Sequence, residues 1–194
     1  MNKQDKKLAW EILGSKDVFA AKPRITVSVQ KVKLPDGRII DDYYHVEFPQ
    51  AVVTVARTKD GRVIMSKQYL HGYQRVSIVL PAGTLENTED PLKAAQRELF
   101  EETGYTSDSW TDMGSMIPHT NYGCGKVHFF HAANAVKTGE PDKGDLEEME
   151  IVLLNDKQIV EAIRSSDIVS PGTITALTLA NVRMNNTISF KDTI

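Results

Sequence analysis

The sequence predicts an α/β fold in which a mixed sheet lies between helices, an α/β/α sandwich, preceded by a small antiparallel sheet. Short apolar segments of strand-like composition recur between residues 51 and 154, with helical patterns between and after them. Before residue 49, apolar and polar residues alternate in the way typical of half-buried strands. A chain of 194 residues is long enough for one such domain with an extension.

Residues 1–48 are expected to form a β extension. Residues 24–32 alternate with a period of two and predict a strand. Residues 34–38 read Leu-Pro-Asp-Gly-Arg, which is a turn signature, and residues 39–48 predict the returning strand. Because a sheet of this size is not stable alone, its uncovered face is expected to pack on something else.

Residues 49–184 are expected to form the main domain, and residues 185–194 a weakly patterned tail. A Lys-Asp-Gly-Arg sequence at residues 59–62 marks a hairpin turn. The expected strands occupy residues 51–56, 63–69, 76–80, 126–132 and 149–154, and the expected helices residues 91–103, 156–163 and 173–184.

The helix expected over residues 91–103 has clear start and stop signals. Asp90 can cap the free N–H groups of the first turn, and Pro91 fits the first helical position. Gly104 can end the helix because glycine tolerates a positive φ. The apolar stripe that would face the core consists of Leu92, Ala95 and Leu99.

Three glutamates share another face of this helix, namely Glu98, Glu101 and Glu102. Like charges at this spacing oppose helix formation by a few tenths of a kcal/mol per pair. A bound cation would turn this repulsion into attraction and would explain why the three glutamates share a face. Oxygen ligands favour Mg²⁺ or Mn²⁺ over zinc, and no His or Cys cluster has zinc-ligand spacing. The alternative is a solvated acidic surface helix.

The helix belongs to a longer pattern, G-x5-E-x7-R-E-U-x-E-E-x-G-U with U a bulky apolar residue, which spans Gly83–Tyr105. This pattern resembles the signature of the Nudix hydrolases, which cleave nucleoside diphosphates linked to another group. The resemblance implies the Nudix fold and implies that Arg97 orients the glutamates, with Glu89 as its partner. It also implies a set of metal ligands, which would be Glu98, Glu101, Glu102 and the carbonyl of Ala82.

Other segments resemble the branch of this family that acts on ADP-ribose and nucleoside diphosphate sugars. The extension at residues 1–48 is similar to one that forms a homodimer by exchanging strands, although it could instead pack on its own chain. The loop at residues 117–125 partly matches a substrate-binding loop of that branch, with Pro118 as its proline. Tyr122 in the same loop keeps dinucleoside polyphosphates open as substrates.

The resemblance also implies a general base in the acidic segment that precedes the strand at 149–154. Glu147 is the first candidate and Glu148 the second, and a solvated acidic turn is the alternative. The branch has Gln-Tyr-Arg where this chain has Leu70 in the third place. Because Leu70 cannot bind phosphate, His71 or Arg75 is expected to replace the lost donor.

Composition excludes some classes of function. A formal net charge of −3 argues against a general nucleic-acid binder. The single cysteine fits a reducing compartment, and the absence of any apolar run near ~20 residues predicts a cytoplasmic protein without a membrane span.

The combined expectation is an Mg²⁺-dependent hydrolase of the pyrophosphate in ADP-ribose or a nucleoside diphosphate sugar. The small-molecule products would be a nucleoside monophosphate and a sugar phosphate. The alternatives are a Nudix hydrolase of dinucleoside polyphosphates or nucleoside triphosphates, and a nucleotide-sensing Nudix module.

Overall fold

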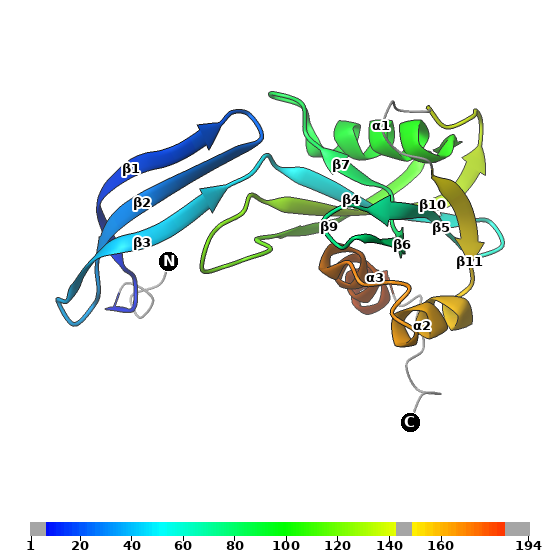
Figure 1. Cartoon of the computed structure of the whole chain (residues 1–194). Coiled ribbons are helices and arrows are strands. Elements are labelled where there is room, and N and C mark those ends of the chain that lie inside the picture. The colour runs from blue at the N-terminus through cyan, green and yellow to red at the C-terminus, as the bar shows by residue number, and fades with distance from the viewer. Residues whose placement is uncertain (1–6, 143–148, 185–194) are drawn as a thin grey trace. The chain divides into compact units, whose positions relative to one another are not determined.

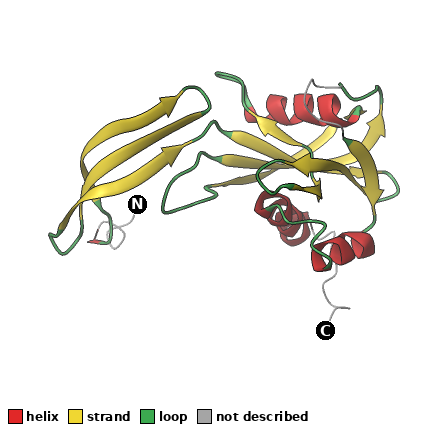
Figure 2. Cartoon of the chain, in the orientation of Figure 1, coloured by secondary structure: helices red, strands yellow, loops and turns green. Residues whose placement is uncertain are grey.

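The computed structural model describes residues 7–142 and 149–184, which fall into two compact units. The N-terminal unit comprises the chain up to Gln50 and the loop Ile117–Lys126. The main unit comprises Ala51–Met116 and the chain from Val127 onward. In Figure 2 the first of these consists of strands and loops, and the helices α1, α2 and α3 all belong to the second. No helix in the described ranges has the length and apolar character needed to cross a membrane.

The N-terminal unit contains an antiparallel sheet of three strands in the order β1-β2-β3 (Figure 1). The strands are β1 (Glu11–Ala21), β2 (Ile25–Lys33) and β3 (Ile39–Glu47). The sequence pattern indicated β2 and β3 but not β1 as a separate strand. Two register shifts in β1, next to Gly14 and Phe19, break the alternation by which a strand is recognised.

The loop Ile117–Lys126 is bound to the edge of β3 by backbone hydrogen bonds. Val46 donates to the carbonyl of Tyr122 at 2.8 Å, and Cys124 donates to the carbonyl of Val46 at 2.7 Å. Gly123 has a φ of 92°, and a side chain there would overlap His45. Only glycine fits this close approach, so the loop sequence itself allows the docking.

The main unit contains an eight-stranded mixed sheet with the central order β11-β5-β4-β10-β8. β4 and β10 are parallel, and the other pairs are antiparallel. β6 pairs with β5, β7 pairs with β4, and β9 pairs with β10. The strands are β4 (Ala51–Thr58), β5 (Val63–Leu70), β6 (Arg75–Val79), β7 (Ala82–Thr84), β8 (Tyr105–Thr106), β9 (Ser109–Met116), β10 (Val127–Lys137) and β11 (Glu150–Leu154).

Helices cover both faces of this sheet, which confirms the predicted α/β/α fold class (Figure 1). α1 (Pro91–Thr103) covers one face, where Val52 of β4 packs with its alanines. α2 (Asp156–Arg164) and α3 (Pro171–Met184) cover the other face, where Val53 belongs to their core cluster. Neighbouring valines thus serve opposite layers because side chains alternate along a strand.

β4 and β5 separate near the middle of the sheet. Their register pairs are Ala56 with Ile64 and Arg57 with Val63. Beyond these pairs, residues 66–70 of β5 pair with β6, and residues 51–53 of β4 pair with β7. The chain passes from β6 to β7 through Leu80 and Pro81, so it crosses from β5 to β4 where these two strands have separated. This connection leads directly into the segment that precedes α1.

Candidate active site

α1 begins and ends where the sequence predicts. The carboxylate of Asp90 accepts from the backbone N–H groups of Leu92 at 3.0 Å and Lys93 at 3.2 Å. Gly104 has a φ of 73°, and its N–H donates to the carbonyl of Phe100 at 2.7 Å. The side chains that anchor the helix to the sheet include Ala94, Ala95 and Leu99, all buried. The glutamate face is therefore held on a rigid element.

Arg97 lies at the centre of a cluster of carboxylates. It donates to both oxygens of Glu89, at 3.0 and 2.9 Å, as the sequence predicts. Its Nη1 also donates to Glu98 at 2.8 Å and to Glu101 at 3.0 Å. These two contacts agree with the expectation that Arg97 orients the glutamates, and the second follows the i,i+4 spacing of Arg97 and Glu101. The sequence did not indicate the carbonyl of Thr84, which accepts from Arg97 at 3.2 Å, because a backbone acceptor leaves no side-chain signal.

The charges of this cluster shift one another's titration. The hydrogen bond from Arg97 lowers the pKa of Glu89, and the N–H of Glu86 lowers it further. Burial raises the pKa of Glu98, whose side chain is 14% exposed, and this outweighs the opposing effect of Arg97. Arg97 thus offsets the repulsion between the carboxylates on this face, and its own pKa is raised, first of all by Glu89.

Two of the glutamates meet the backbone of β7. An Oε2 of Glu102 accepts from the N–H of Ala82 at 3.0 Å. The carboxylate of Glu98 lies where a side chain on residue 83 would be, so that any Cβ on Gly83 would overlap it. The absence of a side chain at Gly83 thus makes room for Glu98. Two carboxylates are thereby gathered beside the exposed residue Ala82.

The residues present fit a divalent cation by their chemistry. Within the described ranges, no three His, Cys, Asp or Glu side chains converge closely enough to hold a metal ion. Arg97 donates to Glu98 and Glu101, while the N–H of Ala82 donates to Glu102. The available donors are all oxygens, which Mg²⁺ and Mn²⁺ prefer. The carboxylate of Glu98 packs against the backbone at Gly83, next to the carbonyl of Ala82 that is expected to bind the same cation.

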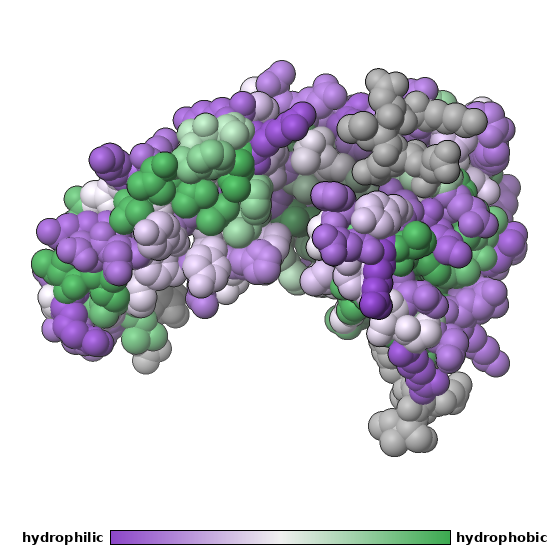
Figure 3. Space-filling model, viewed as in Figure 1, coloured by the Kyte–Doolittle hydropathy of each residue, from purple (hydrophilic) through white to green (hydrophobic). Residues whose placement is uncertain are grey.

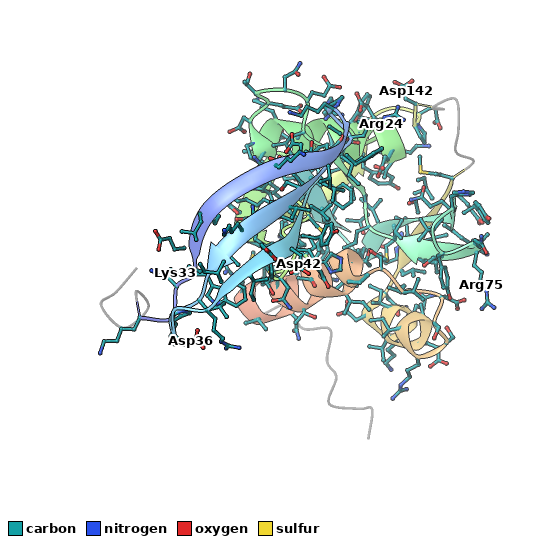
Figure 4. All side chains as sticks on the ribbon, turned by 60° about the vertical axis from the view of Figure 1, so that its left-hand side comes forward. Arg24, Lys33, Asp36, Asp42, Arg75 and Asp142 are labelled. Carbon is teal, nitrogen blue, oxygen red and sulfur yellow. The ribbon has the colours of Figure 1, made fainter. Side chains whose placement is uncertain are left out.

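The residues expected to bind substrate lie in two other places. His71 and Arg75 belong to the β5–β6 hairpin, where Arg75 is the cross-strand partner of Leu70. The Arg75 guanidinium lies 6.0 Å from the ring centre of Tyr73, and Figure 4 shows its side chain projecting outward. Pro118 and Tyr122 lie in the loop of the N-terminal unit, with Tyr122 55% exposed. The remaining expectations, which concern Glu147, Glu148 and the tail at 185–194, fall outside the described residues.

The fold places a group of glutamates around Arg97 on one face of α1, and comparisons with known proteins show to which family this arrangement belongs. A model of the NUDIX domain matches residues 47–167. An ADP-ribose pyrophosphatase of Bacillus subtilis (strain 168) is 32% identical over 159 residues, which cover 82% of this chain and 84% of that protein. The chain therefore belongs to the Nudix family, as a hydrolase of its pyrophosphatase class. Enzymes of this family generally use divalent metals, in agreement with the donor set.

Two further similarities bear on the range of the family and on the fold. A methanol dehydrogenase activator of Bacillus methanolicus is 30% identical, over 72% of this chain and 74% of that protein. A crystal structure of an ADP compounds hydrolase superimposes with a TM-score of 0.76, covering 91% of this chain and 94% of that one. At 20% identity, that structural match supports the fold alone.

Proposed function

We propose that this protein hydrolyses the pyrophosphate of ADP-ribose or of a nucleoside diphosphate sugar with Mg²⁺, giving a nucleoside monophosphate and a sugar phosphate. The observation that carries the proposal is the gathering of Glu98 and Glu102 at the backbone of Ala82 and Gly83, with Arg97 behind them. The names of relatives such as the ADP-ribose pyrophosphatase of Bacillus subtilis support this choice of substrate.

In this proposal Glu98, Glu101, Glu102 and the carbonyl of Ala82 hold the Mg²⁺. When bound, the metal neutralises charge on the pyrophosphate oxygens and lowers the pKa of a coordinated water. Arg97 keeps the carboxylates in place, because its guanidinium donates to Glu98 and Glu101 on the helix and also to Glu89 and the carbonyl of Thr84 outside it. Catalysis then depends mostly on positioning and charge neutralisation, as in other phosphoryl transfers.

The general base in this proposal is Glu147, with Glu148 as the alternative. The described residues on either side of that segment support the choice. Asp142 donates its N–H to the carbonyl of Glu101 at 2.7 Å, and Glu150 pairs with Lys67 of β5. The chain on both sides is thus tied to the unit that carries the glutamates, one side directly to α1.

Among the proposed substrate-binding residues, Arg75 has the stronger support. Arg75 of β6 is the cross-strand partner of Leu70, so its guanidinium can donate hydrogen bonds to phosphate at a place where the Leu70 side chain has no donor. His71 is the alternative, and its ring lies 6.3 Å from that of Tyr69. Pro118 and Tyr122 complete the proposed set.

We also propose a homodimer formed through the N-terminal sheet. Every residue of β1 is exposed, and Figure 3 shows hydrophobic side chains gathered over this unit. Trp10, Ile12 and Phe19 are 48%, 62% and 56% exposed, which is unusual for a face that stays in water. Sedimentation should give a dimer that Phe19→Lys converts to a monomer, and a monomeric wild-type protein would refute the proposal.

The cytoplasmic location stays a prediction.

The substrate is tested with a panel of ADP-ribose, GDP-mannose, UDP-glucose, diadenosine polyphosphates and nucleoside triphosphates, each with Mg²⁺. Hydrolysis of ADP-ribose or a nucleotide sugar above the others supports the proposal. Preference for diadenosine polyphosphates or triphosphates selects the alternative hydrolase, and no turnover across the panel selects the sensing module.

Glu147→Gln and Glu148→Gln, made separately, are expected to differ in kcat; equal and trivial effects would place the base elsewhere.

A further inference from the structure

The segment Leu80–Ala82, which comprises the connection between β6 and β7 and the first residue of β7, is held by hydrogen bonds to three different elements. The N–H of Leu80 donates to Oγ1 of Thr173 in α3 at 3.3 Å. The carbonyl of Pro81 accepts from the N–H of Thr54 in β4 at 2.9 Å. The N–H of Ala82 donates to Glu102 in α1 at 3.0 Å.

These contacts form a link through the sheet. Thr173 is 3% exposed and lies on the α3 face that packs against the sheet with Ala176, Leu177 and Ala180. Glu102 belongs to α1, on the opposite side. Leu80, which is 1% exposed, bonds to Thr173, and only Pro81 separates it from Ala82, which bonds to Glu102. The fixed φ and missing N–H of Pro81 limit the ways in which this segment can rearrange.

The hydrogen bond to Thr173 is expensive to lose. A buried backbone N–H without a partner is strongly disfavoured, and Leu80 lies where β4 and β5 have separated. Without the Thr173 hydroxyl, Leu80 would shift toward another acceptor. Because Ala82 follows two residues later, the shift would move both its N–H, which holds Glu102, and its carbonyl.

We propose that Thr173 is a positioning residue for the metal site, acting from the far side of the sheet through Leu80–Ala82 on Glu102 and on the carbonyl of Ala82. The inference rests on the proposed metal role of these two groups. Thr173 contacts neither substrate nor metal, and its effect passes through the backbone. Residues that orient ligands in this way typically change metal affinity or activity by about tenfold to a hundredfold.

Two pairs of proteins isolate the hydroxyl. Wild type and Thr173→Val have nearly the same shape, and Thr173→Ser and Thr173→Ala differ only by the hydroxyl oxygen. Thr178→Val is the matched control, because Thr178 lies in the same helix but is exposed, and its hydroxyl donates to the carbonyl of Ile174 in that helix at 2.8 Å. The measurements are Mn²⁺ affinity by titration calorimetry without nucleotide, kcat and KM on the best substrate of the panel, and Tm.

Thr173→Val and Thr173→Ala are expected to weaken Mn²⁺ binding and lower kcat by about tenfold, with KM changed less than about twofold. Thr173→Ser and Thr178→Val are expected to stay close to wild type. A lower Tm with unchanged Mn²⁺ affinity and kcat would reduce Thr173 to a structural role, as would a serine variant as impaired as the alanine one. If valine prevents folding, the serine–alanine pair decides. If wild type hydrolyses nothing in the panel, the proposed function fails, while the Mn²⁺ titration still tests Thr173.

Discussion

The carboxylate of Glu98 occupies the position that a side chain on Gly83 would take. The contact joins the first residue of the signature to the helix fifteen positions later, although nothing in a spacing pattern states that the two touch. The contact explains why residue 83 is a glycine, since a Cβ there would push Glu98 away from β7. It also links the placement of this carboxylate to the backbone that carries Ala82.

Gly83→Ala is therefore expected to lower kcat by about tenfold or more, because Glu98 must move to admit the methyl group. Gly14→Ala is the control, since in the described part of the chain no residue other than its two chain neighbours has an atom within 4 Å of a Cβ at Gly14. Steady-state kinetics of both variants at saturating Mg²⁺ provide the measurement. Full activity in Gly83→Ala would show that the position of Glu98 does not matter.

Arg97→Lys should retain the charge but lose the forked contact with Glu89 and the simultaneous contacts with Glu98 and Glu101. We expect kcat to fall at least about tenfold. Arg62→Lys, which alters the exposed pair with Asp60, should have wild-type kinetics. Similar rates for all three proteins would mean that a positive charge alone suffices at position 97.

The N-terminal cap of α1 should matter for stability. Asp90→Ala is expected to lower the free energy of unfolding by about 1 kcal/mol, because two N–H groups lose their acceptor. Asp90→Asn should remain close to wild type, since asparagine caps equally well. Urea unfolding measures both, and equal losses in the two variants would point to the charge rather than the cap.

The parts predictable from the sequence were those in which local chemistry decides. Asp90, Pro91 and Gly104 fix the ends of α1, and the 3.6-residue period assigns its faces. β9 was missed because Ser109–Met116 lacks the apolar alternation of a strand, and it exists by pairing with β10. The link from Thr173 to Glu102 has no local signal, since it depends on backbone groups and on contacts between residues far apart in the sequence.

His131 should make the stability depend on pH. It is 4% exposed, and its Nε2 has no hydrogen-bond partner among the residues that the structure describes. Burial, helped by the charge of Arg57, lowers the pKa of His131 below 6.5. Because the unfolded chain binds this proton more readily, the contribution is complete above about pH 6.5 and is lost as the pH falls toward the lower folded pKa.

Urea unfolding between about pH 7.5 and about pH 5.5 checks this expectation. The free energy of unfolding should fall more steeply in wild type than in His131→Leu, which has no titrating group at this position. Parallel losses in the two proteins would assign the pH dependence to other groups.

The most direct test of the proposed metal site is the turnover of ADP-ribose by wild type and Glu102→Gln, followed as AMP formation with Mg²⁺ and with a chelator. Wild type should form AMP with Mg²⁺ and none with the chelator. Glu102→Gln should be slower by about a hundredfold or more with an unchanged Tm, because a carboxylate ligand is lost from a partly exposed position. Near-normal turnover by a folded Glu102→Gln protein would contradict the assignment of α1 as the metal-binding helix.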